Sequence, residues 1–273
     1  KSSDIDIIAY GGYKGPSLEA TKDYIDCTIK SGNKKTADRI INSLYVDHQF
    51  SIDFYENIHA IFKGKEVIEY DHHLCHAAGA FYSSGYDKSY VMTFDGRGDL
   101  QSGVIWEASK SNGIKRIKTF CELKSLGFLY GQITELLGYK SHRHEGKITG
   151  LAAFGKKTTL CDKLLNLISY QSGEIIISKN FMPFNKPNEL ATLKKICESY
   201  SDYEIAFAVQ FVLEYIISNL IIYYIPKKTP LVLSGGIFGN VKLNQKIREL
   251  NHTKKYSFFQ KWVMEGYHMA QFV

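Results

Sequence analysis

The chain has 273 residues, of which 44% are hydrophobic and 23% charged, and its formal net charge is +6. This length and composition predict a globular protein of one large domain or two modest ones, and exclude a disordered or low-complexity chain. The lysines lie in separated pairs, which suits anionic small molecules rather than nucleic acid, and the five cysteines form no Cys-x-x-Cys pair, which favours reduced thiols in the cytoplasm.

The first part of the chain predicts two strands separated by helices. The hydrophobic pattern places strands at 5–10 and 66–70 and helices at 17–30, 35–44 and 54–62. The sequence opens almost directly on a strand, as though inside a domain. We therefore expect the lobe that contains these elements to be incomplete.

A run of histidines follows the second strand. Residues 71–77 read Asp-His-His-Leu-Cys-His-Ala. If residues 71–84 form a helix, His72 and His76 lie one turn apart on the same face, where two imidazoles can share a metal ion. His73 then points elsewhere. On its own, a His-x-x-x-His pair is more often polar surface than a metal site.

An aspartate at the end of a strand favours a metal site over polar surface. Residues 91–94 read as a buried strand, and Asp95 emerges from it into a turn rich in Gly and Asp, with a return strand at 102–108. Carboxylates at strand ends often hold metals or phosphates. The histidine run and Asp95 together predict a metal site beside an anion-binding turn.

The middle of the chain carries a polar loop between two predicted helices. The first helix covers 127–137, and small and apolar residues at 147–155 indicate a second, tightly packed one. Between them, Glu145, Gly146 and Lys147 place a carboxylate and an ammonium beside a flexible residue. Taken alone, this loop is most simply solvated. Further helices are expected at 160–169 and 188–200, with a strand at 174–178.

The last third of the chain contains a second candidate site. Its most apolar stretch, 205–225, includes several polar residues and reads as a long buried helix rather than a membrane span. A strand at 231–233 then runs through Gly235 and Gly236 into a helix at 240–250. Such a turn offers backbone N–H groups and a helix dipole to a phosphate. A last strand is expected at 256–260.

Four stretches, in this order and at these separations, resemble the O-carbamoyltransferases of the NodU/CmcH type. They are residues 72–85, 93–99, 145–155 and 234–244. The resemblance implies an actin/Hsp70/hexokinase-like fold, ribonuclease H-like, in which two related α/β lobes hold a nucleotide in the cleft between them. We assign 1–88, including the histidine helix, to an incomplete N-terminal lobe, and 89–273 to the second lobe.

The resemblance also implies the chemistry. Family members move a carbamoyl group from carbamoyl-adenylate, made from carbamoyl phosphate and ATP, to a hydroxyl of a small-molecule or saccharide acceptor. Carried over, His72, His76 and Asp95 hold a divalent metal, with iron expected first and zinc or manganese as alternatives. Asp95 and Lys147 are the expected catalytic residues, and Lys147 would meet a phosphate or carbamoyl oxygen. The nucleotide is expected against Gly96, Gly98, Glu145, Gly146, Gly235, Gly236 and Asn240.

The sequence departs from the family pattern in three places. A His-Asp-Ser-like motif in an initial strand and turn has no counterpart before Ile5. A further metal-binding Asp is replaced by Glu265, which is the residue nearest the expected place and the predicted fourth ligand. The C-terminal domain that makes carbamoyl-adenylate is absent from the sequence, so we expect this chain to perform the transfer half of the reaction.

Three other functions compete with this interpretation. A zinc metallohydrolase would place Glu directly after the first histidine, where His73 stands. The tRNA threonylcarbamoyl-transferring family shares the fold and the kind of metal site, but it has Glu-Gly before its second histidine, where this chain has Leu74 and Cys75. A non-catalytic or degenerate nucleotide-binding module of the same fold stays open.

Overall fold

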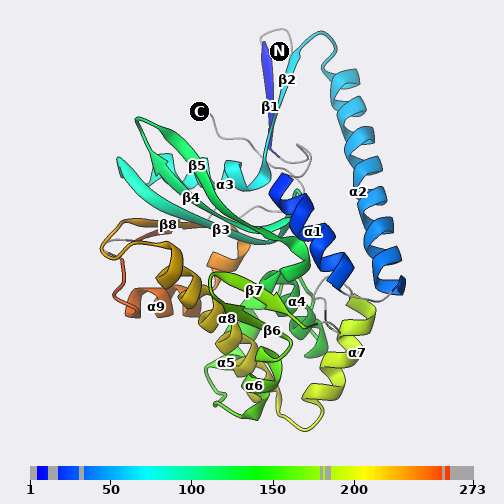
Figure 1. Ribbon diagram of the computed structural model, residues 1–273, viewed down its shortest axis with the longest axis vertical. Coiled ribbons are helices and arrows are strands. Elements are labelled where there is room, and N and C mark those ends of the chain that lie inside the picture. The colour runs from blue at the N-terminus through cyan, green and yellow to red at the C-terminus, as the bar shows by residue number, and fades with distance from the viewer. Residues whose placement is uncertain are drawn as a thin grey trace.

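A five-stranded sheet forms the centre of the larger part of the fold (Figure 1). The computed structural model describes residues 5–11, 18–30, 34–178, 181, 186–253 and 256–258. The strand order is β5-β4-β3-β8-β9, in which β3, β4 and β5 form an antiparallel meander and β8 and β9 run parallel to β3. The strands are β3 (Lys88–Gly98), β4 (Gln101–Ser109), β5 (Gly113–Cys121), β8 (Leu231–Ser234) and β9 (Tyr256–Phe258).

This arrangement confirms the predicted α/β class. A meander of three antiparallel strands followed by two parallel strands added on the side of the first is the order of a ribonuclease H-like sheet, as the resemblance implied. Parallel strands cannot be joined by a tight turn, so helices carry the chain from β5 to β8 and from β8 to β9. Strand β5, which the sequence pattern did not predict, is added to the outer edge by the hairpin after Ser109.

Strand β3 is buried on both faces because helices cover each side of the sheet. Alternate residues point to opposite faces of a strand. Val91 packs with Phe81 of helix α3 (His72–Ser83) on one face, whereas Met92 and Phe94 belong to the large core on the other. The end of β3 therefore emerges between two packed layers.

The large core lies beneath the sheet and is built mainly by helices (Figure 1). Its helices are α4 (Leu126–Leu136), α5 (Glu145–Ala152), α6 (Thr159–Leu165), α7 (Lys186–Cys197), α8 (Asp202–Tyr224) and α9 (Val241–Glu249), and a hairpin of β6 (Ile168–Gln171) and β7 (Glu174–Ile177) joins them. The predicted helix at 160–169 thus ends early, and its last residues enter β6.

Helix α8 is the central helix of this core. Ser201 begins it with a capping box closed by Glu204, so two of its first backbone N–H groups are satisfied. Among the described residues, α8 alone has the length and hydropathy to cross a membrane, and 67% of its most apolar window is buried in the fold. This agrees with the expected long buried helix.

The N-terminal elements add a two-stranded sheet and two helices, and the first of these helices packs against β5. Strand β1 (Ile7–Gly11) pairs in parallel with β2 (Glu66–Tyr70), and α1 (Leu18–Lys30) and α2 (Lys34–Ile61) lie between them in the chain. Helix α2 is one continuous helix where the sequence analysis expected two, because no Gly or Pro interrupts it. The elements η2 (Glu122–Lys124) and η3 (Gly236–Gly239) are short 3-10 turns.

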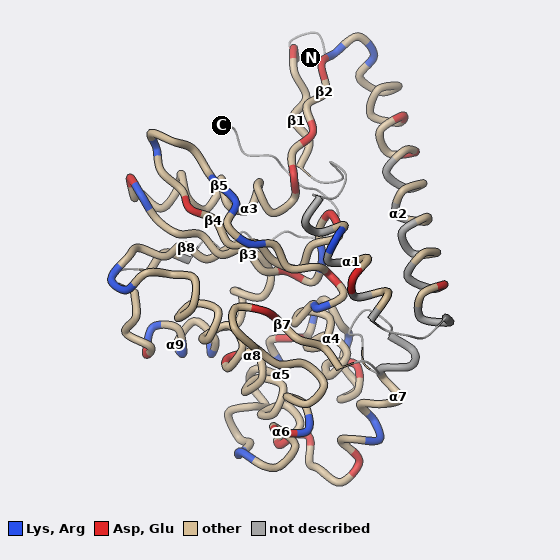
Figure 2. Tube along the Cα trace, viewed as in Figure 1, with Lys and Arg blue, Asp and Glu red and all other residues tan. Residues whose placement is uncertain are grey.

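Helix α3 packs on the five-stranded sheet, and its Cys75 also lies against Gly11 of β1. Its buried residues Ala77, Ala80 and Phe81 contact the sheet face formed by Val91 and Trp106. The predicted division at residue 88 assigned α3 to the N-terminal lobe, and that division stays a prediction. Figure 2 shows lysines and arginines spread over many elements, as the separated lysine pairs of the sequence indicated.

Candidate metal centre

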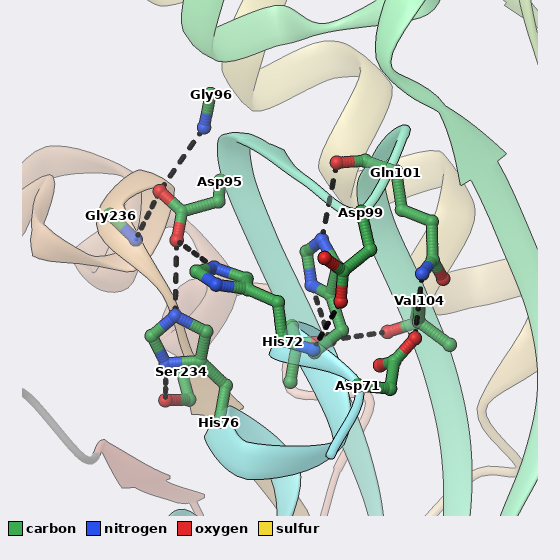
Figure 3. A network of polar contacts seen from close by, with 12 residues as sticks. Asp71, His72, His76, Asp95, Gly96, Asp99, Gln101, Val104, Ser234 and Gly236 are labelled. Carbon is green, nitrogen blue, oxygen red and sulfur yellow. Dashed lines mark hydrogen bonds and ion pairs between the residues drawn. The ribbon is translucent and has the colours of Figure 1, made fainter. Parts of the chain in front are cut away.

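Helix α3 presents two histidines to the end of β3 (Figure 3). Asp71 begins the helix, because its Oδ1 accepts a hydrogen bond of 2.8 Å from the backbone N–H of Leu74. One turn apart, His72 and His76 direct their Nε2 atoms at the same carboxylate oxygen, Oδ2 of Asp95, at 3.4 and 3.1 Å. The predicted cluster is therefore assembled in the fold.

Asp95 uses both of its oxygens. Oδ2 faces the two histidines, while Oδ1 accepts hydrogen bonds from the backbone N–H groups of Gly96 and Gly236, at 3.1 and 3.3 Å. Burial opposes ionisation, but the hydrogen bonds and charges of His72 and His76 outweigh it and hold the pKa of Asp95 well below its usual value of 3.8. Burial also opposes protonation of His72, yet Asp95 raises the pKa of that ring above 6.5.

The donor set fits a divalent metal. One ligand atom from each of His72, His76 and Asp95 lies within 4.8 Å of the others, and the three side chains are 14%, 29% and 25% exposed. Donors bound at about 2.1 Å in cis-octahedral or tetrahedral positions are roughly 3.0 to 3.4 Å apart, which matches the two nitrogen–oxygen distances. Imidazole with carboxylate suits iron, zinc and manganese. The predicted fourth ligand, Glu265, lies outside the described residues.

The glycine turn is pressed against the end of β3. Gly235 has a φ of +97°, and a Cβ built on it would lie 2.3 Å from the backbone oxygen of Phe94, so no side chain fits there. A Cβ on Gly236 would lie 2.8 Å from Oδ1 of Asp95. The two predicted features, the metal cluster and the glycine turn, are thus direct neighbours.

Gly98 has a packing role that the sequence did not reveal. A Cβ on it would lie 2.2 Å from Cδ2 of His72, so the absence of a side chain leaves room for the imidazole. Gly96 is looser, with the ring of Phe128 at 3.8 Å from a built Cβ. Their expected contacts with a nucleotide stay predictions.

Asn240 holds four helices together. Its Oδ1 caps α9 by accepting from the N–H of Leu243 at 2.9 Å, and its Nδ2 donates to Oε1 of Gln210 at 2.8 Å and to Oγ1 of Thr149 at 3.2 Å. The hydroxyl of Tyr130 joins the same network, and burial raises its pKa to about 12. The amide of Asn240 is fully used inside the protein. A nucleotide contact by this side chain would require it to exchange partners.

The loop residues Glu145, Gly146 and Lys147 begin helix α5. Oε1 of Glu145 accepts from the backbone N–H of His142 at 2.5 Å, and Nζ of Lys147 lies 5.1 Å from the centre of the Tyr139 ring. Within the described part of the chain, no contact joins Lys147 to the metal cluster. Its catalytic role stays a prediction.

His73 is the site residue that the sequence did not explain. The ring is fully buried and hydrogen-bonded to Thr93 and to the backbone oxygen of Gln101. Burial, with help from the neighbouring His72 and His76, lowers the pKa of His73 to about 3, so the ring is neutral. The sequence signal for this buried position was that His73 directly follows His72 on the helix, so its side chain points away from the face that carries the two ligands.

Comparisons with known proteins agree with the resemblance. Residues 4–258 match the family model for the N-terminus of carbamoyltransferases. The nodulation protein NolNO of Sinorhizobium fredii is 30% identical over 181 residues, which cover 64% of this chain and 26% of that protein. An uncharacterized protein of Methanocaldococcus jannaschii is 28% identical over 207 residues, covering 68% and 33%. The chain thus spans about a third or less of these relatives.

Solved structures give a weaker likeness. HypF of T. kodakarensis aligns with 77% of this chain and 36% of its own, at 13% identity and a TM-score of 0.44.

Proposed function

The chain belongs to the family of carbamoyltransferase N-terminal domains, and we propose that it holds the site where a carbamoyl group passes from carbamoyl-adenylate to a hydroxyl group of a small-molecule or saccharide acceptor. The observation that supports this most directly is the meeting of His72, His76 and Asp95 beside the Gly235–Gly236 turn. A cluster that can hold a metal ion and a turn that can approach a phosphate together suit a mixed anhydride of carbamate and phosphate.

The carbamoyl transfer changes no oxidation state, so it needs neither an oxidant nor a reductant. The acceptor oxygen forms a bond to the carbamoyl carbon, the bond from that carbon to the adenylate oxygen breaks, and the acceptor proton passes to a base. The products are the carbamate ester and adenosine monophosphate. A group that binds phosphate must therefore stabilise the charge that grows on the departing adenylate.

Three residues would hold the metal and two would hold the phosphate. His72, His76 and Asp95 are the proposed metal ligands, and a divalent ion bound there supplies Lewis-acid charge to phosphate and carbonyl oxygens. The Gly235–Gly236 turn would place backbone beside the same phosphate without a side chain in the way, and the N–H of Gly236 would have to leave Oδ1 of Asp95 to donate to it. Asp95 aligns the two parts, because one oxygen faces the histidines and the other faces the turn.

The activity is tested with the full-length protein. Loaded in turn with iron, zinc or manganese and supplied with ATP, carbamoyl phosphate and a panel of hydroxyl acceptors, it should release adenosine monophosphate in an acceptor-dependent way. If no acceptor supports turnover in a preparation whose metal content is confirmed, a nucleotide-binding module without catalysis is the better interpretation.

The metal ligands are tested separately. His76→Ala should remove the metal measured by elemental analysis and leave the circular dichroism spectrum unchanged, because loss of a ligand empties a site without opening a core. His48→Ala is the matched control, since His48 lies exposed on α2. Equal metal content in the two variants would refute the assignment of His76.

A further inference from the structure

The first turn of α3 is fixed to the β3–β4 hairpin by buried hydrogen bonds. Nδ1 of His73 lies 3.1 Å from Oγ1 of Thr93, and its Nε2 lies 3.3 Å from the backbone oxygen of Gln101. The indole N–H of Trp106 donates to the same Thr93 oxygen at 3.1 Å. His73, Thr93 and Gln101 have no exposed surface, and Trp106 has 2%.

These contacts determine which nitrogen of His73 carries the proton. A backbone carbonyl can only accept, so Nε2 must be the donor and Nδ1 the acceptor. Trp106 can only donate, so the Thr93 oxygen accepts from it, and because Nδ1 of His73 can only accept, the bond of 3.1 Å requires the Thr93 hydroxyl to donate to that nitrogen rather than to the oxygen of Val104 at 3.3 Å. The chain of bonds therefore has one consistent direction, from the indole to the Gln101 carbonyl.

Gln101 holds the start of α3 at a second point. Its side-chain Nε2 donates to Oδ2 of Asp71 at 2.7 Å, and Arg116 donates both to that carboxylate and to the Gln101 amide oxygen. Asp71 is the residue that caps α3. One residue of β4 thus contacts the cap through its side chain and His73 through its backbone.

The ligands on either side of His73 depend on this attachment. His72 and His76 come from α3, whereas Asp95 comes from β3, so the distances between them are set by how the helix sits on the strand. Thr93, which bonds to His73, is two residues before Asp95. A sub-ångström shift of the helix would alter both distances to Asp95 together, and metal sites are sensitive to groups that orient their ligands.

We propose that His73 is a positioning residue, which fixes α3 on the β3–β4 hairpin so that His72 and His76 meet Asp95 at metal-binding distances. The inference rests on the proposed function, because it gives His73 a role in the metal centre. The competing explanation is that His73 only fills space in the core. Both explanations predict a loss of stability on substitution, and they differ in the effect on metal affinity.

The variants separate hydrogen bonding from packing. His73→Leu keeps a similar volume and removes both hydrogen bonds, whereas His73→Gln keeps an N–H that can reach the Gln101 carbonyl. Thr93→Val keeps the shape of the side chain and removes the hydroxyl that contacts both His73 and the indole N–H of Trp106. Phe81→Leu is the matched control, because it removes buried packing from the same helix through a residue that has no polar contact with the site.

Affinity for Zn²⁺ alone is measured by competition with a chelator, and the coordination geometry by the visible spectrum of the Co²⁺ form. We expect His73→Leu to weaken Zn²⁺ binding about tenfold or more and to change the Co²⁺ spectrum. His73→Gln should recover most of the affinity, and Phe81→Leu should lower the melting temperature without changing the affinity. If His73→Leu does not fold, the same comparison is made with Thr93→Val.

The possible failures are distinguishable. Unchanged affinity in His73→Leu or Thr93→Val, or an equal loss in Phe81→Leu, would overturn the positioning role and leave the proposed function intact. A wild-type chain that binds neither ion would overturn the metal centre itself. Nitrogen-15 NMR of the metal-free protein adds a test independent of the metal, since a proton on Nδ1 of His73 would overturn the hydrogen-bond chain.

Discussion

The contact of the glycine turn with β3 predicts an unusually large effect of one methyl group. In Gly235→Ala, the new Cβ would lie 2.3 Å from the oxygen and 2.9 Å from the carbon of Phe94, at a φ of +97°. At φ +97° and ψ 164°, a backbone region occupied almost only by glycine, an L-residue costs at least the about 1–2 kcal/mol of the left-handed helical region. To relieve the overlap, the backbones must separate, which also strains the β3–β8 pairing at Thr93 and Ser234. Losing one or two of its hydrogen bonds costs about 0.5–1.5 kcal/mol each.

Gly138→Ala is the control that removes the steric part. Gly138 has a similar φ of +80°, but nothing lies within 4 Å of a Cβ built there. We therefore expect a loss of about 1–2 kcal/mol in the free energy of unfolding for Gly138→Ala and about 2–5 kcal/mol for Gly235→Ala. Urea denaturation, with the slope checked for two-state behaviour, measures both. Equal losses in the two variants would refute the conclusion that the turn is pressed onto β3.

Three further predictions concern the same region. Gly236→Ala should weaken Zn²⁺ binding about tenfold, because its Cβ would displace Oδ1 of Asp95, and unchanged affinity in a calorimetric titration would contradict this contact. In the metal-free protein, the raised pKa of His72 stabilises the fold below pH 6.5, and the lowered pKa of Asp95 stabilises it above pH 3.8. The free energy of unfolding of wild type, measured by urea denaturation, should therefore exceed that of Asp95→Asn by the largest amount between these two pH values. Parallel pH profiles of the two proteins would argue against the ion pair. Asn240→Ala should lower the free energy of unfolding by about 1–3 kcal/mol in the same measurement, whereas Asn112→Ala, at an exposed position, should lower it by almost nothing. A similarly small effect of both substitutions would mean that the network contributes little.

The features predicted from sequence are those set by local patterns. A helix that begins at Asp71 places His72 and His76 on one face regardless of what surrounds it, and an apolar strand ending at Asp95 delivers a carboxylate at its tip. The resemblance added the prediction that the glycine turn lies at the same site. These predictions needed only periodicity and motif order.

The features that were missed depend on contacts between distant segments. Nothing near His73 in the sequence indicates that Thr93 and Gln101 will meet its two nitrogens. Asn240 was expected to face a nucleotide, but its partners come from three other helices. Edge strand β5 was overlooked because alternating lysines and threonine gave it a polar surface pattern, and only pairing with β4 makes it a strand.

The position of β8 in the sheet has a consequence for the order of assembly during synthesis. Asp95 and the histidines lie within 24 residues of one another, whereas Gly236 is 141 residues further along the chain. A nascent chain that has not yet reached β8 can already pair β3 with β4, but the other edge of β3 carries unpaired backbone groups. Exposed edges of this kind promote association between chains. The pairing of β8 with this edge therefore brings the Gly235–Gly236 turn to Asp95 and, in the same step, covers an edge that could pair with another chain.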